Sequence, residues 1–177
     1  MNLSVQAKQL LREGRVAEAE RLYEQILATS PDDAEALNLV ALAALRRRDL
    51  ARALALLRHA VAVHPNDFHS RYHLARCHDE AGEVMQALPL YESAVAMQPS
   101  NPGARLHYAY ALERSGAREQ ALAHYVRALA QAQSEGRWLD PRTTPANLKP
   151  LVEQAVSLVR QTKRALADSA LMELRAR

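Results

Sequence analysis

The sequence is poor in the residues that strands, tight loops and covalent links require. Its 177 residues include one cysteine, one phenylalanine, one tryptophan and five glycines, and aromatic residues make up 5% of the chain. A single cysteine excludes an internal disulfide framework. The scarcity of aromatic residues argues against a sandwich or barrel of strands, and so few glycines leave no glycine-rich loop that could cradle a phosphate.

Long hydrophobic runs and a large excess of one charge are missing as well. No apolar stretch approaches the roughly 18 residues that a membrane-spanning helix needs, and the N-terminus lacks the apolar core of a signal peptide. The chain has 23 Lys and Arg against 20 Asp and Glu, a formal net charge of +3. This balance does not indicate a nucleic-acid-binding protein. We therefore expect a cytoplasmic protein that binds neither membrane nor nucleic acid.

Alanine and leucine are the residues that the sequence has in abundance. Both are strong helix formers. The charged residues, 24% of the chain, are too few for a generic disordered chain and are typical of a folded protein. The composition therefore predicts an all-α protein.

The sequence repeats itself at a regular interval. Pro31, Pro65 and Pro99 are evenly spaced. Small, bulky and turn residues recur at the same interval in four columns, which hold Ala7, Ala41, Ala75 and Ala109; Ala19, Ala53, Ala87 and Ala121; Tyr23, Leu57, Tyr91 and Tyr125; and Gly14, Arg48, Gly82 and Gly116. The chain is thus predicted to contain four units, at residues 1–33, 34–67, 68–101 and 102–135.

Each unit is predicted to be a pair of helices, because apolar residues recur at three- and four-residue intervals on both sides of the turn column. Proline then ends the second helix. Asp32, Asn66 and Asn101 lie where they can cap the helix that follows. The fourth unit has Gln133 in place of proline, so its second helix should run on towards Gly136.

These columns, and the interval at which they recur, resemble the 34-residue signature of tetratricopeptide repeat (TPR) proteins. The resemblance covers about three quarters of the chain and implies a right-handed α-solenoid of four helix hairpins over residues 1–135. The sequence departs from the family in its early tryptophan column, which holds Leu3, Leu37, Arg71 and Arg105. In TPR proteins the first helix of each unit lines a concave groove that binds protein ligands.

The last part of the chain differs in character. Residues 136–150 contain three prolines and predict a linker or a folded-back loop, with Trp138 as an anchor on the last repeat. Residues 151–177 form an amphipathic pattern that predicts a helix capping the fourth repeat. Because no stop signal follows, we expect this helix to continue into a longer parent chain.

A second, shorter resemblance concerns residues 143–166. This segment is similar to the connector that follows the repeats in some bacterial TPR-containing aspartyl/asparaginyl β-hydroxylases. The resemblance implies that the parent chain is a dioxygenase dependent on iron and 2-oxoglutarate. The segment itself carries no catalytic motif, so none of that chemistry would lie in the present chain.

Candidate chemical sites are weak. His69, His73 and Cys77 follow one another in four-residue steps, which places them on one helical face at metal-ligand spacing, but no second cysteine joins them. No G-x-S-x-G motif is present. The run Arg46–Arg48 is followed at once by Asp49 and is interpreted as a solvated turn. We expect no catalysis, no cofactor and no metal in this chain.

The ligand groove is predicted from the non-core positions of the first helices. Its candidate residues are Lys8, Arg12, Asn38, Arg46, Tyr72, His73, Arg76, His107, Tyr110 and Arg114. Basic side chains pair with carboxylates and tyrosines are frequent at binding hot spots, so an extended or acidic peptide is the expected ligand. The set of residues with which chaperone-tail TPR proteins bind a terminal carboxylate is missing.

Three functional hypotheses remain open. The leading one is a non-catalytic scaffold that binds a protein or peptide in the TPR groove. The alternative is the N-terminal recognition module of a larger aspartyl/asparaginyl β-hydroxylase. A third hypothesis is self-association, since incompletely capped solenoids stack end to end.

Overall fold

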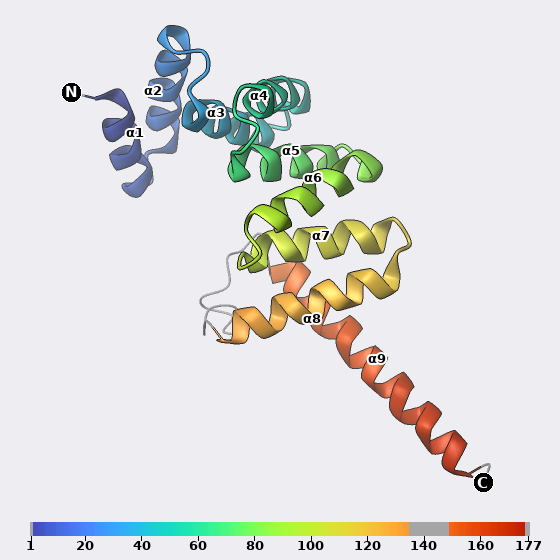
Figure 1. Cartoon of the computed structure of the whole chain (residues 1–177). Coiled ribbons are helices and arrows are strands. Elements are labelled where there is room, and N and C mark those ends of the chain that lie inside the picture. Colours follow the sequence, from blue (N-terminus) through green and yellow to red (C-terminus); the bar gives the residue numbers. More distant parts are fainter. Residues whose placement is uncertain (1, 135–148, 176–177) are drawn as a thin grey trace. The chain divides into compact units, whose positions relative to one another are not determined.

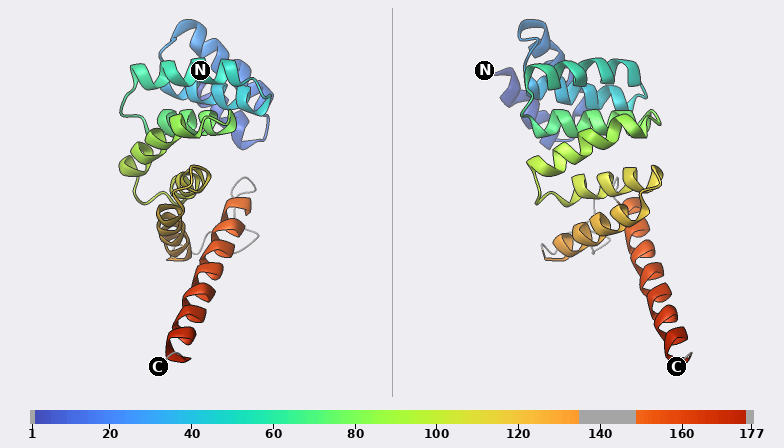
Figure 2. Two further views of the ribbon diagram at one scale, coloured as in Figure 1. Left: turned by 90° about the vertical axis from the view of Figure 1, so that its right-hand side faces the viewer. Right: turned by 45° about the vertical axis from the view of Figure 1, so that its right-hand side comes forward.

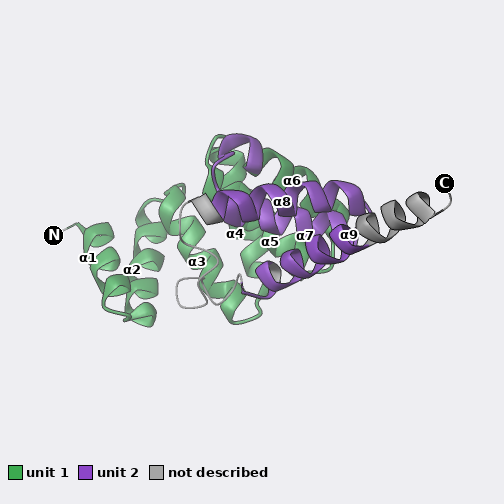
Figure 3. Ribbon diagram, turned by 90° about the horizontal axis from the view of Figure 1, so that it is seen from below, with its two compact units in different colours: residues 1–94 green, residues 95–177 purple. Residues whose placement is uncertain are grey.

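The computed structural model describes residues 2–134 and 149–175, which form nine α-helices and contain no strand (Figure 1). The all-α fold class of helix hairpins predicted from the sequence is confirmed. The chain divides into two compact units, residues 1–94 and 95–177 (Figure 3). None of the helices in the described ranges is long and apolar enough to cross a membrane.

Unit 1 is a stack of helix hairpins. It contains α1 (Leu3–Arg12), α2 (Val16–Thr29), α3 (Ala34–Arg46), α4 (Leu50–Val63), α5 (Phe68–Glu80) and most of α6 (Val84–Met97). Within unit 1, α2 packs against α3, α4 packs against α5, and α3 also contacts α5. The hairpins follow one another from blue to green in the views of Figure 2. Helix α6 runs through Pro89.

The turns inside the hairpins follow from the repeated turn column. All four of its members have a left-handed backbone, with φ of 77° at Gly14, 63° at Arg48, 81° at Gly82 and 90° at Gly116. The N–H of the next residue donates to a carbonyl five residues earlier, as from Arg15 to Leu10 at 2.8 Å. These bonds satisfy carbonyls at the end of the first helix that have no partner within it.

The helices that open the later hairpins begin at side-chain caps. Asp33, Asp67 and Asn101 each accept a hydrogen bond from the backbone N–H three residues on. The predictions of Asp32 and Asn66 as caps were therefore wrong by one residue. A cap must lie directly before the first helical residue, and the bend after the proline extends one residue further than we expected.

The repeated columns form the core. All members of the two alanine columns are fully buried, and Tyr23, Leu57, Tyr91 and Tyr125 are at most 1% exposed. Where two helices cross closely, a small side chain leaves room for a large one on its partner. The periodicity of the sequence is therefore a packing pattern. Ala7 lies in one buried cluster with Tyr23, and Ala41 and Ala53 lie in another with Leu57.

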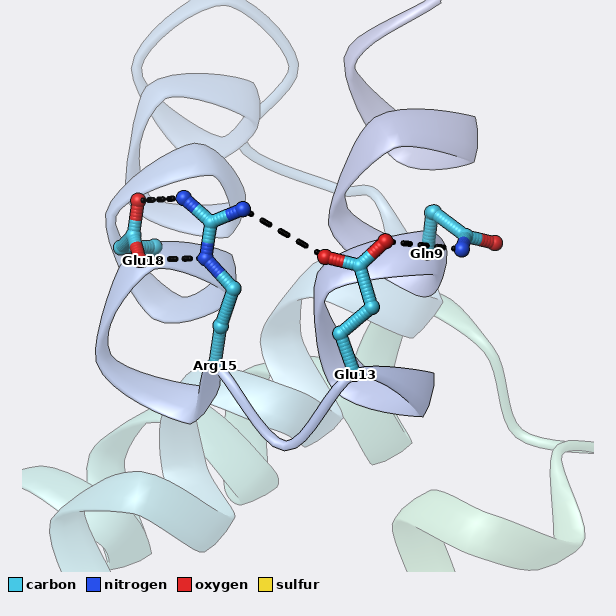
Figure 4. A network of polar contacts seen from close by, with 4 residues as sticks. All are labelled: Gln9, Glu13, Arg15 and Glu18. Atoms are coloured by element: carbon cyan, nitrogen blue, oxygen red, sulfur yellow. Dashed lines mark hydrogen bonds and ion pairs between the residues drawn. The ribbon is translucent and has the colours of Figure 1, made fainter.

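A polar network closes the first hairpin at the turn between α1 and α2 (Figure 4). The guanidinium of Arg15 donates to both carboxylate oxygens of Glu18, at 2.7 and 2.6 Å, and to Glu13 at 3.4 Å. Gln9 donates to the other oxygen of Glu13 at 2.9 Å. The hydrogen bond from Arg15 lowers the pKa of Glu18 below its ordinary value. All four side chains lie at the surface, so the network fixes the turn rather than the core.

Unit 2 contains one complete hairpin and the last helix. It consists of the end of α6, α7 (Pro102–Arg114), α8 (Arg118–Ser134) and α9 (Lys149–Arg175). Helix α8 has 17 residues where α2 and α4 have 14, as expected from Gln133 in place of proline. Most of the predicted linker at residues 136–150, together with Trp138, lies outside the described residues, whereas Lys149 and Pro150 already belong to α9.

Helix α9 covers the α7–α8 hairpin. Val152, Ala155 and Leu158 are buried, and α9 contacts both α7 and α8. Gln154 donates to Glu113 of α7 at 2.9 Å, and the hydroxyl of Tyr125 donates to the same carboxylate oxygen at 3.0 Å. The apolar side chains of Val152, Ala155 and Leu158 thus pack the first half of α9 on the last hairpin.

Candidate functional site

The basic residues predicted for the groove in α1 and α3 lie at the surface. Lys8, Arg12 and Arg46 are exposed. The ammonium of Lys8 pairs with Glu35 of α3 at 2.9 Å, and the hydroxyl of Tyr23 donates to the same carboxylate at 3.2 Å. Glu35 therefore links α1, α2 and α3. The charge of Lys8 is already paired with this carboxylate.

Helix α5 carries a cluster of rings on the predicted groove face. The ring centroids of Tyr72 and His73 are 5.2 Å apart, and the guanidinium of Arg76 lies 6.0 Å from the centroid of Tyr72. Burial raises the pKa of Tyr72 to about 12. Burial, followed by the charges of Arg76 and His69, lowers the pKa of His73 to about 3. His73 is therefore a neutral imidazole at pH 7.

Asn38 has another role than the one we predicted from the sequence. It is 6% exposed, and the two hydrogens of its Nδ2 are shared among three acceptors, the carbonyl of Ala34 at 2.8 Å, Asp67 at 3.0 Å and Ser70 at 2.8 Å. These bonds fasten α3 to the start of α5. Its Oδ1 is buried and has no hydrogen-bond partner among the described residues. Asn38 thus belongs to the contact between two hairpins rather than to an open surface.

A cavity of about 430 Å³ lies between α3 and α5, and we call it the α3–α5 pocket. Its lining residues are Ala34, Glu35, Asn38, Leu39, Leu42, Asp67, His69 and His73. Two of them, Asn38 and His73, were predicted as groove residues. Leu39, Leu42 and Asp67 were missed as site residues, because a partly exposed leucine and a helix cap carry no sign of binding in the sequence.

The carboxylate of Asp67 is held in its charged form. Burial by itself would raise its pKa, but the hydrogen bonds donated by Ser70 and Asn38 outweigh burial and leave the pKa below its ordinary value. A carboxylate that accepts several hydrogen bonds is stabilised as the anion. The pocket therefore has a permanent negative charge at the start of α5.

The remaining predicted residues lie on α7 in unit 2. His107 and Tyr110 are half-buried, and Arg114 is exposed. The guanidinium of Arg114 lies 5.6 Å from the ring centroid of Tyr110, which is a cation–π distance. The structure thus repeats on α7 the pairing of arginine and tyrosine, one helical turn apart, that it shows on α5.

The metal hypothesis fails on geometry. Cys77 is fully buried, and its thiol lies 4.0 Å from the carbonyl of Leu50, whereas His69 is exposed. Burial raises the pKa of Cys77 to about 11, which disfavours the thiolate that binds metals. Over residues 2–134 and 149–164, no three His, Cys, Asp or Glu side chains gather as metal ligands would.

The fold resembles solved structures over about three quarters of the chain. A crystal structure of MamA aligns with a TM-score of 0.65 at 22% identity, covering 76% of this chain and 78% of that one. MamA of RS-1, as a double mutant, aligns with the same score at 20% identity, covering 75% of both chains. The K341M mutant of the O-GlcNAc transferase of Thermobaculum terrenum aligns with a TM-score of 0.65 at 28% identity, and the match covers 75% of this chain but 25% of the transferase.

Comparison with curated proteins finds no match. The resemblance of residues 143–166 to a hydroxylase connector receives no support from the comparisons and stays a prediction. Family models described as tetratricopeptide repeat match residues 5–68, 41–84 and 80–140. With the turn column, the alanine columns and the helix hairpins in place over the described part of this range, the chain belongs to the tetratricopeptide repeat family.

Proposed function

We propose that the chain is a non-catalytic scaffold whose first helices hold a segment of another protein. TPR proteins bind protein partners, and the observation that carries the proposal for this chain is the α3–α5 pocket. Its lining combines leucines with carboxylate, amide and imidazole groups. Ligand sites typically have such a mixture of apolar surface and a few polar groups.

The side chains around the pocket suit a peptide better than a small metabolite. Tyr72 presents a rigid ring next to His73, and rigid aromatic residues recur among binding hot spots. Arg12 and Arg46 are exposed near the ends of α1 and α3, where they can pair with carboxylates of a partner. We propose that acidic side chains of the bound segment contact these two arginines.

The test is a pair of charge-matched double variants. The groove variant carries Arg12→Glu and Arg46→Glu on first helices, and the control carries Arg21→Glu and Arg58→Glu on the second helices α2 and α4. All four arginines are exposed, and both variants change the net charge equally. A partner captured by the wild-type chain should bind the groove variant at least about tenfold more weakly, since tenfold corresponds to about 1.4 kcal/mol.

The control variant should retain the wild-type affinity. Equal losses in both variants would show that binding depends on net charge alone. Undiminished binding to the groove variant would place the partner on another surface and overturn the proposal.

A further inference from the structure

The lining of the α3–α5 pocket indicates what enters it. Leu39 and Leu42 supply apolar surface, Glu35 and Asp67 supply carboxylates, and no Lys or Arg is among the described residues that line it. The pocket thus differs in charge from the exposed Arg46 at the end of α3, which lies about 12 Å from Asn38 and about 16 Å from Glu35 along a helix that rises about 1.5 Å per residue. One groove face therefore offers two regions of opposite charge.

One amide oxygen that lines the pocket is an acceptor without a donor. The three bonds of Asn38 to Ala34, Asp67 and Ser70 are all donated by its Nδ2, which fixes the amide so that Oδ1 is the atom left without a partner among the described residues. A buried acceptor without a donor destabilises the fold, because it has lost its hydrogen bonds to water. Turning the amide over would place Oδ1 against the carboxylate of Asp67, so the side chain cannot satisfy itself by flipping.

The carboxylates tolerate an incoming cation. Asp67 lines the pocket as an anion that accepts hydrogen bonds from the neutral groups of Ser70 and Asn38. Glu35 pairs with Lys8 at 2.9 Å, but both side chains are at least 40% exposed. Exposed ion pairs contribute little to stability, so a competing cation can share Glu35 at little cost.

We propose that the α3–α5 pocket binds the cationic side chain of a lysine or arginine in the partner segment. The inference rests on the proposed function, because the cation arrives on a protein segment held by the first helices. Its aliphatic stem lies against Leu39 and Leu42, its charge faces Asp67 and Glu35, and an N–H points towards Asn38 Oδ1. A carboxylate would instead meet two like charges. The partner segment is then bipolar, with a basic residue for the pocket and acidic residues for the arginines.

The experiment uses the ¹⁵N-labelled full chain and two blocked amino acids as probes. N-acetyl-arginine methylamide is titrated to the order of 10 mM, since a single residue binds at millimolar strength at best. N-acetyl-citrulline methylamide, which has nearly the same shape and no charge, is the control. Arginine should shift the amide resonances of Leu39, Leu42, His69 and the Asn38 side chain, and citrulline should not. Equal shifts with both probes, or arginine shifts confined to other residues, would overturn the inference.

Two matched variants separate the pocket from net charge. Asp67→Asn keeps a good helix cap and removes the pocket's anion, so it should weaken arginine binding about tenfold. Asp33→Asn makes the same change at the equivalent cap one repeat earlier, outside the pocket, and should leave binding unaltered. Equal loss in the two variants would contradict the inference. If Asp67→Asn leaves arginine binding unchanged while the Arg12→Glu, Arg46→Glu variant still loses the partner, the pocket assignment fails and the proposed function stands.

Discussion

Arg48 has the left-handed backbone conformation of the turn column, in which the other three members are glycines. Its φ is 63°, and a left-handed conformation costs an ordinary residue about 1–2 kcal/mol. Arg48→Gly should therefore raise the free energy of unfolding by about 0.5–1 kcal/mol, after allowing for the greater freedom of glycine in the unfolded chain. The midpoint of urea unfolding measures this gain.

The neighbouring residue is the control for this substitution. Arg47 has an ordinary φ of −84° and pairs with Glu20 at 2.5 Å. Arg47→Gly should lower the midpoint, because it loses the ion pair and relieves no strain. If Arg48→Gly also lowers the midpoint of urea unfolding, the left-handed conformation of Arg48 does not destabilise the folded chain as expected.

His73 makes stability depend on pH. Burial holds its pKa at about 3 in the folded chain, against about 6.5 in an unfolded chain. Between these values the unfolded chain binds the extra proton, so stability is unaffected above about pH 6.5 and falls as the pH decreases below it. The loss amounts to at most about 1.4 kcal/mol per pH unit, or about 2 kcal/mol between pH 6.5 and 5.

Urea titrations at pH 6.5 and pH 5 test this dependence. His73→Gln should reduce the difference between the two midpoints, whereas His69→Gln, at an exposed position one turn earlier, should leave it as in the wild type. An unchanged difference in His73→Gln would show that His73 takes up a proton freely in the folded chain.

Two arginines form hydrogen bonds that the residue pattern could not predict. Arg71 and Arg105 occupy the family's tryptophan column, and each donates from Nη2 to the carbonyl of the proline six residues earlier, Pro65 and Pro99. The spacing revealed that the column departs from the family. It could not reveal the shared bond, because a backbone carbonyl acceptor leaves no mark in the residue pattern.

At the scale of the element, the helix hairpins could be predicted because their causes are local. The turn column requires a left-handed residue, and the alanine columns require a close helix crossing. Each requirement recurs once in every repeat and can be recognised in the sequence by the residue type at that position. The exact caps were less predictable, since Asp32 and Asp33 are adjacent and chemically identical, and only the backbone bend decides which one precedes the helix.

Helix α9 offers a test of the contact between elements. Ala155 is fully buried at the face of α9 that packs on α7 and α8. Ala155→Arg should lower the stability of unit 2 by about 1–3 kcal/mol or displace α9, because the larger side chain overfills the contact. Hydrogen exchange of the amides of α7 and α9 measures the effect.

The control for that variant lies two residues earlier on the same helix. Glu153 is exposed, so Glu153→Arg introduces the same side chain without entering the contact, and exchange should be as slow as in the wild type. Slow exchange in Ala155→Arg would mean that the packing of α9 does not stabilise α7.

At the scale of the whole molecule, the succession of helix hairpins could be predicted and the α3–α5 pocket could not. The hairpins depend on residue columns that recur along the chain. The pocket depends on Asn38 reaching Asp67 and Ser70, which are 29 and 32 residues away, and on two leucines that are only partly buried. These contacts form only when neighbouring hairpins pack against each other, so the spacing of residues in the sequence does not reveal them.

Site-specific photo-crosslinking is the most direct test of whether a protein segment lies along the first helices α1, α3 and α5. One variant carries p-benzoylphenylalanine in place of His69, which is exposed and lines the α3–α5 pocket. The control carries it in place of Met85, which is 73% exposed on the second helix α6. The captured partner should crosslink from position 69 and not from position 85. A crosslink from position 85 with none from position 69 would contradict it.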